Sequence, residues 1–195
     1  MNHLFNYSKL LSACLVLLCT FNVFAKIESK AIPDQKNAIS AETGIYSIST
    51  TTSSASGLGL FSLEYLRVIN MKWAGSLSYS QFVTDPGSVS SNIFGYDLVV
   101  HWCWKACRPY KKEEDSTNAS YFPRWSYIIQ GGLSQRFIQL DERTVGFNGL
   151  RVGGEVQYFK QSPLAWYGRT YIARLTNGTS DMNVIAITAG ARWWF

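Results

Sequence analysis

Beyond residue 42 the chain is built from segments in which apolar and polar residues alternate, and no helical period competes with this alternation. A period of two predicts β-strands with one apolar face, and turn-forming residues separate the segments. We expect eight strands, an even number, each close to or above the ~9–11 residues with which a tilted strand crosses a bilayer. The expected strands span residues 43–52, 58–69, 73–83, 93–104, 124–137, 147–159, 166–175 and 183–195.

The N-terminus has the pattern of an export signal. An apolar run, Leu10–Phe24, follows Lys9 and ends at Ala25, where small or apolar residues form a cleavage-like site. We expect residues 1–25 to be a signal peptide, residues 26–42 a flexible N-terminal leader and residues 43–195 the folded domain. A lipoprotein-type cleavage box at Leu11–Cys14 is the competing interpretation, but this box opens the apolar run, whereas such boxes close it.

Alternation alone does not distinguish a soluble sandwich from a membrane barrel, and the tryptophans decide between them. All seven lie at the chain end or beside the connections after the second, fourth and sixth expected strands. An indole ring with a polar N–H is most stable at a membrane–water boundary. We therefore expect a girdle on one side of a transmembrane barrel. Its members are Trp73, Trp102, Trp104, Trp125, Trp166 and Trp193.

The export signal, the eight amphipathic strands and the terminal "GARWWF" together resemble the small eight-stranded outer-membrane barrels of Gram-negative bacteria, the OmpA/OmpX-like membrane domain. The resemblance implies an eight-stranded antiparallel up-and-down transmembrane β-barrel, monomeric and surrounded by outer-membrane lipid after cleavage near Ala25. It also implies that Ala191, Trp193 and Phe195 form the C-terminal signal read by the outer-membrane assembly machinery. One feature departs from the family: the longest connection, Lys105–Pro123, falls on the periplasmic side.

The strand faces that oppose the apolar ones collect charged residues, which we expect to fill the barrel interior. An eight-stranded barrel is just wide enough for side chains to fill it, and buried charges persist when they are paired. We therefore expect a salt-bridged plug in which Arg192 pairs with Glu155 or Glu64. A narrow conducting path is the alternative. The expected interior charges are Glu64, Asp97, His101, Arg136, Arg151, Glu155, Arg174 and Arg192.

His101 has Asp97 four residues before it and Cys103 two residues after it on the same strand face, a set that invites a hydrolase interpretation. Some barrels of the resembled kind modify lipid A with a lipid-facing His and Ser. Here His101 is expected to point inward, and no His-x-Ser pair follows the signal, so we assign no catalytic residue. A zinc site from His101, Cys103 and Cys107 lacks a fourth ligand, and we expect no metal and no cofactor.

Cys103 and Cys107 are the two cysteines that remain after the signal. In an oxidising compartment a disulfide is the default. Four extended residues span about 13 Å, whereas a disulfide needs Cα atoms within ~6.8 Å, so we expect the chain to turn immediately after Trp104.

The net charge of +5 comes from Lys and Arg scattered along the chain, and we expect no nucleic-acid partner. The sequence thus predicts an outer-membrane barrel with a closed interior and a structural or surface-interaction role. A lipid-modifying enzyme of the outer membrane is the second hypothesis, and a small pore is the third.

Overall fold

The computed structural model describes residues 31–51, 54–83, 92–104, 107–112, 120–140 and 143–195. The expected signal peptide and the first residues of the expected leader lie outside these ranges. Among the described residues, no helix is long and apolar enough to cross a membrane.

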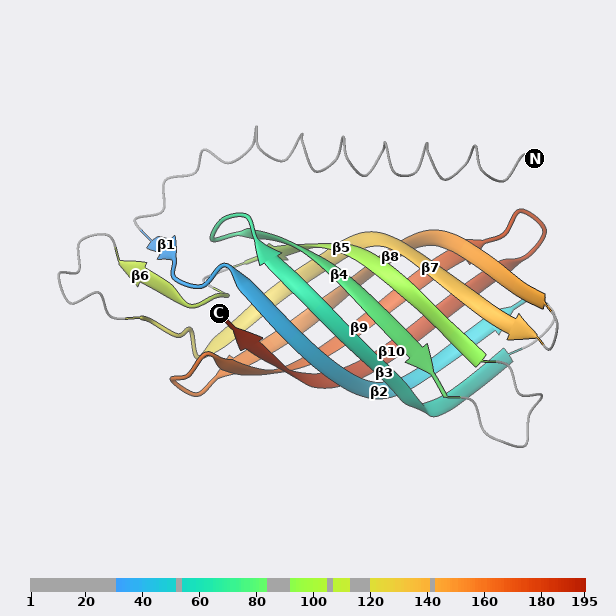
Figure 1. Ribbon diagram of the computed structural model, residues 1–195, viewed down its shortest axis with the longest axis horizontal. Coiled ribbons are helices and arrows are strands. Elements are labelled where there is room, and N and C mark those ends of the chain that lie inside the picture. The colour runs from blue at the N-terminus through green and yellow to red at the C-terminus, as the bar shows by residue number, and fades with distance from the viewer. Residues whose placement is uncertain (1–30, 52–53, 84–91, 105–106, 113–119, 141–142) are drawn as a thin grey trace. The chain divides into compact units, whose positions relative to one another are not determined.

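Eight antiparallel strands close into a barrel in the order β10-β2-β3-β4-β5-β7-β8-β9 (Figure 1). Each barrel strand pairs with the next barrel strand along the chain, β5 with β7 included, and β10 closes the ring against β2. This confirms the predicted all-β, up-and-down fold. The strands are β2 (Asn37–Thr50), β3 (Ser54–Val68), β4 (Trp73–Phe82), β5 (Asn92–Cys103), β7 (Trp125–Leu140), β8 (Arg143–Phe159), β9 (Leu164–Thr176) and β10 (Asp181–Trp194).

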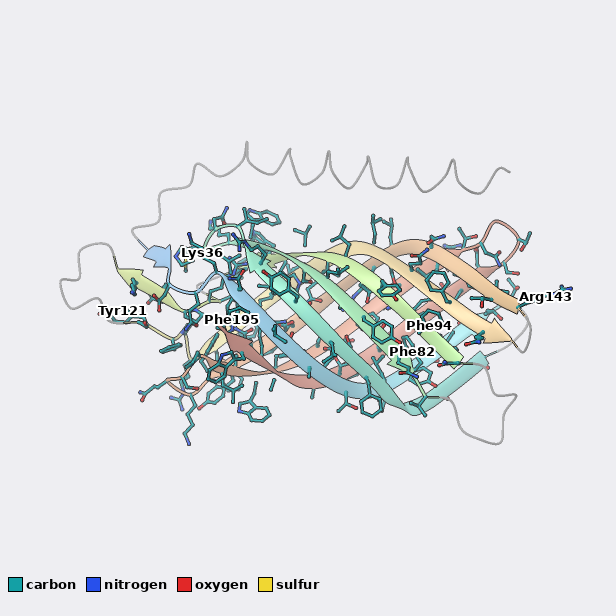
Figure 2. The ribbon with its side chains drawn as sticks, viewed as in Figure 1. Lys36, Phe82, Phe94, Tyr121, Arg143 and Phe195 are labelled. Carbon is teal, nitrogen blue, oxygen red and sulfur yellow. A yellow bond between two sulfur atoms is a disulfide. The ribbon has the colours of Figure 1, made fainter. Side chains whose placement is uncertain are left out.

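The two ends of the barrel differ. At one, called the terminal end, the Asn37 and Phe195 backbones exchange two hydrogen bonds, of 3.0 and 2.9 Å. A separate two-stranded sheet of β1 (Ala31–Pro33) and β6 (Tyr110–Lys112) lies at the same end in Figure 1. The other, called the loop end, carries the connections after β2, β4, β7 and β9. Figure 2 shows Lys36 and Phe195 at the terminal end and Arg143 at the loop end.

The barrel begins earlier in the chain than the sequence predicted. β2 starts at Asn37, so part of the expected flexible leader, 37–42, is strand. Ser40 and Glu42 are buried inside the barrel, and these inward polar side chains made the segment look like a polar leader. The β7 and β8 strands are likewise longer than expected. Residues 138–140 of the predicted turn 138–146 continue β7 to Leu140, and residues 143–146 begin β8 at Arg143.

Inward and outward faces alternate as expected. On β5 the buried positions include Asp97, Val99 and His101, while Tyr96 is 46% exposed. Outward residues near mid-barrel are apolar and about half exposed, for example Leu77 and Ile187. An apolar exterior around a polar interior is the reverse of a soluble domain and suits a surrounding lipid phase.

Toward the loop end this polarity reverses. The interior there is an apolar cluster that includes Leu60, Phe82 and Met182. Polar residues occupy several outward positions around it, as in the cross-strand pairs Ser49–Asn183, Gln135–Asn148 and Gln139–Thr144, with the stacked Phe94 and Phe137 among them. The 17 residues of β8, at ~3.3 Å each and tilted ~45°, rise about 40 Å, more than the ~30 Å hydrocarbon core. The loop end therefore has the polarity of a barrel that projects into water.

Candidate functional site

Six ionisable side chains from six strands meet inside the barrel, on the terminal side of its middle. All six occupy inward positions of the two-residue period and are buried. We call them the terminal-side cluster. Its members are Glu42 of β2, Glu64 of β3, His101 of β5, Glu155 of β8, Arg169 of β9 and Arg192 of β10.

Two guanidinium groups hold the three carboxylates. Arg192 Nη1 lies 2.6 Å from Glu155 Oε1, and its Nη2 lies 2.8 Å from Glu64 Oε2. Arg169 Nη2 lies 2.8 Å from the same Glu64 oxygen and 2.8 Å from Glu155 Oε2, and its Nη1 lies 3.2 Å from Glu42 Oε1. Charge-assisted pairs of this geometry are about twice as strong as neutral hydrogen bonds.

Neutral side chains supply the carboxylates with further hydrogen bonds. Serine, threonine and glutamine at inward positions donate to them from four strands, so the carboxylates do not depend on the arginines alone. These hydrogen bonds add to the ion pairs in satisfying the carboxylate oxygens. The pairs are Ser40–Glu64 at 3.0 Å, Ser76–Glu64 at 2.8 Å, Gln130–Glu155 at 2.8 Å and Thr188–Glu42 at 2.9 Å.

A second group of charges, the loop-side cluster, consists of Asp97, Arg136 and Arg151. Arg136 Nη1 lies 2.8 Å from Asp97 Oδ1, and Arg151 Nη1 lies 2.5 Å from Asp97 Oδ2. The Arg151 guanidinium also stacks on Tyr171, 3.7 Å from the ring centroid. Asp97 has one negative charge for two arginines. The cation–π contact with Tyr171 partly stabilises the extra positive charge of Arg151.

His101 does not have the environment of a catalytic base. Its Nε2 lies 2.7 Å from Ser76 Oγ and 3.4 Å from Glu64 Oε1, so both partners use the same ring nitrogen. A catalytic triad instead places the nucleophile and the orienting acid on opposite nitrogens. The imidazole is 1% exposed. Asp97 and Cys103, which the sequence suggested as partners of His101, have other partners: Asp97 pairs with Arg136, and Cys103 forms a disulfide.

The predicted disulfide between Cys103 and Cys107 is confirmed, with the Cα atoms 5.9 Å apart. Both cysteines are fully buried, and Gln157 Nε2 donates to the Cys107 carbonyl at 2.9 Å. The predicted turn immediately after Trp104 falls on residues 105–106, which lie outside the described residues. Because the two sulfurs are bonded to each other, neither is a thiolate ligand for a metal.

The disulfide begins a cap over the terminal end, formed by residues 107–112 and 120–124 together with 31–36. Arg108, itself a residue of the cap, is buried and donates to the Asn70 carbonyl. Burial, followed by the positive charge of Arg192, lowers the pKa of Arg108 to about 9. The guanidinium therefore remains charged at neutral pH, in the mouth of the barrel.

Aromatic and ionic contacts attach the cap to the barrel and to the chain before β2. The Phe122 and Phe159 ring centroids lie 6.2 Å apart, and Phe159 contacts Trp194 at 6.4 Å. Lys111 Nζ lies 3.1 Å from Asp34 Oδ1. The connection Lys105–Pro123 thus lies at the terminal end, where the sequence had placed it, and its described parts are folded against the barrel.

The six expected girdle tryptophans face outward at or near the terminal end. Trp104, Trp125, Trp166 and Trp193 are 53–64% exposed, and Trp102 contacts Trp104 edge to face at 5.5 Å. Trp73 pairs with Trp102 across β4 and β5. Phe195 and Ala191 lie on the same outward face of β10 as Trp193, whereas Trp194 is buried.

Seven of the eight expected interior charges are buried inside the barrel, and Arg174 is the error. Its side chain is 78% exposed and pairs with Asp181 at 3.2 Å near the loop end. Two interior charges, Glu42 and Arg169, were missed. On β9 the buried set is odd-numbered, so Arg169 faces in and Arg174 faces out. Trp166, which the sequence had already placed in the outward girdle, is on the same even-numbered face as Arg174, so that assignment, applied to the whole strand, would have placed both arginines correctly.

A closed eight-stranded barrel with an apolar exterior and a charged interior is the fold of the small outer-membrane β-barrels. Neisserial surface protein A (NspA) has a similar structure, with a TM-score of 0.62 and 12% identity over 82% of this chain and 97% of that one. The resemblance inferred from the sequence is therefore confirmed at the level of the fold.

Two further solved structures match less closely. The N-terminal β-barrel domain of Pseudomonas aeruginosa OprF has a TM-score of 0.44 and 12% identity, over 80% of this chain and 99% of that one. Ail, the attachment invasion locus protein of Yersinia pestis, has a TM-score of 0.43 and 10% identity, over 82% and 99%. No protein-family model and no curated protein matches the chain.

Proposed function

We propose that this protein is a structural barrel of the Gram-negative outer membrane, closed to ions and solutes, with its terminal end in the periplasm. The observation that carries the proposal is the bridge that Arg192 makes across the lumen. It joins Glu64 of β3 to Glu155 of β8, two strands that lie four places apart in the closed order of eight. A buried side chain that ties opposite walls together occupies the path that a channel needs.

The terminal cap supports the same proposal. Phe159 and Trp194 fill the barrel end beneath Phe122, and the disulfide fixes the start of the cap. At the loop end the apolar interior cluster fills the lumen again. Breaking a buried ion pair costs about 3–5 kcal/mol, so thermal opening of the lumen is rare. A structural or surface-interaction role needs no such opening.

Planar-bilayer recording tests the proposal. The purified barrel, folded into bilayers and verified by its heat-dependent gel mobility, is expected to give no stable conductance steps, while a general porin in the same bilayers gives large ones. Steady steps of porin size from the folded protein would refute the closed interior.

A further inference from the structure

The outward face of the barrel is hollowed near the terminal end. Two adjoining hollows, of about 810 and 730 Å³, share Val156 and Gly168 and extend across β7, β8, β9, β10, β2 and β3. Each has a volume in the ~300–1,000 Å³ range of small-molecule sites. We call the two together the outer groove.

Small residues form the floor of the outer groove. In the strand register Thr43 pairs with Ala189, and Ala189 pairs with Gly168, so the row crosses β2, β10 and β9 without a large side chain. Larger side chains stand on either side of this row. The residues that form these walls include Phe61, Trp104, Trp125, Tyr127, Tyr158 and Trp166.

Aromatic residues with a polar atom mark the terminal-end limit of the groove. Trp125 and Tyr158 are cross-strand partners with ring centroids 4.8 Å apart, and Trp166 pairs with Tyr158 from the next strand. Such rings lie at the level where acyl chains give way to headgroups. The groove therefore occupies the acyl-chain level and opens toward headgroups at its terminal end.

Two basic side chains follow directly beyond these rings. Arg124 precedes Trp125 and accepts a backbone hydrogen bond from Phe159 at 3.1 Å, and Lys160 follows Phe159; both side chains are exposed. The exposed ion pairs within the described ranges are Lys111–Asp34 and Arg174–Asp181, so neither of these two cations has an acidic partner there. Basic groups next to a membrane surface attract anionic lipid headgroups.

We propose that the outer groove binds an anionic glycerophospholipid, with an acyl chain on the small-residue floor and the phosphate between Arg124 and Lys160. The groove supplies shape, the aromatic rings fix the depth and the two cations supply the charge that a phosphate requires. The inference rests on the membrane location proposed above, and in that orientation the terminal end meets the phospholipid leaflet.

Native mass spectrometry of the purified protein released from detergent tests the inference. The probe is dioleoyl phosphatidylglycerol, and its zwitterionic counterpart is dioleoyl phosphatidylcholine. The unaltered protein is expected to retain one phosphatidylglycerol in preference to phosphatidylcholine. Absence of that preference would overturn the proposal, as would a dimer peak that replaces the lipid-bound monomer, because the groove would then be covered by a second copy.

Gly168→Leu fills the groove without disturbing the wall, because a Cβ at this position meets its nearest heavy atom only at 4.0 Å. Gly131→Leu is the matched control, since a Cβ there meets nothing within 4 Å and the residue lies outside the groove. We expect the first variant to lose the bound lipid and the second to keep it. Equal retention in both would refute the acyl-chain site. Heat-dependent gel mobility verifies that each variant is folded.

Arg124→Gln and Lys160→Gln test the headgroup contact. Each is expected to weaken phosphatidylglycerol binding about fivefold and phosphatidylcholine binding less, because the choline ammonium already compensates the charge of the phosphate. Lys72→Gln, an exposed lysine in the turn between β3 and β4, is the control and is expected to have no effect. Unchanged phosphatidylglycerol binding in both variants would overturn the phosphate contact. Channel recording is independent of this test, so a non-conducting barrel without lipid preference would refute the lipid site alone.

Discussion

Replacement of Arg192 by methionine should destabilise the barrel strongly. Its guanidinium makes ion pairs of 2.6 Å with Glu155 and 2.8 Å with Glu64, and both partners are fully shielded from water. Without it, Arg169 alone must neutralise three buried carboxylates. Removal of one partner from a buried pair costs about 3–5 kcal/mol, and here two carboxylates lose a partner, so we expect a value near 5. That is a large share of the ~5–15 kcal/mol that stabilises a typical domain.

Urea unfolding in phospholipid vesicles, followed by tryptophan fluorescence, measures the effect. Arg174→Met is the matched control, because the same chemical change there removes an ion pair whose arginine is 78% exposed. Exposed pairs contribute about 0–1 kcal/mol, so the two variants should differ by several kcal/mol.

A double variant tests the same ion pair in a second way. Arg192→Met combined with Glu155→Gln removes one charge of each sign and leaves Arg169 with two carboxylates. Its loss of stability should be smaller than the sum of the two single losses by about 1 kcal/mol or more. The reasoning is wrong if Arg192→Met unfolds within about 1 kcal/mol of Arg174→Met, or if the two single losses simply add.

Two further predictions concern the cap and the barrel wall. Reduction of the Cys103–Cys107 disulfide should add the mass of two hydrogens and lower the free energy of unfolding by about 2 kcal/mol, as the chain-entropy estimate gives for so short a loop; an unchanged mass after reduction would show free thiols. Gly132→Ala should fail to form the heat-modifiable barrel, because its Cβ would lie 2.1 Å from the Leu98 carbonyl oxygen, whereas Gly131→Ala, with nothing within 4 Å, should fold normally; equal folding of the two would contradict the wall geometry.

The fold could be predicted because its causes are local in the chain. Alternation with a period of two assigns each side chain to a face, and the even spacing of turns gave eight strands. The strand boundaries were less predictable. Ser40 and Glu42 are polar because they bind charged side chains inside the barrel. In a leader the same residues would be polar because they face water, and one sequence cannot distinguish these two reasons.

The sequence by itself determined that the chain alternates through eight strands, carries its tryptophans at one level and joins Cys103 to Cys107, because these properties depend on residues close together in the chain. Only the tertiary structure decided that Glu64 and Glu155, on opposite walls, share Arg192 and Arg169, and that Arg174 lies outside. It also placed Ala189 beside Gly168 in a hollowed outer face. Closure of the barrel fixes the register between distant strands, and pairing between side chains far apart in sequence follows from that register.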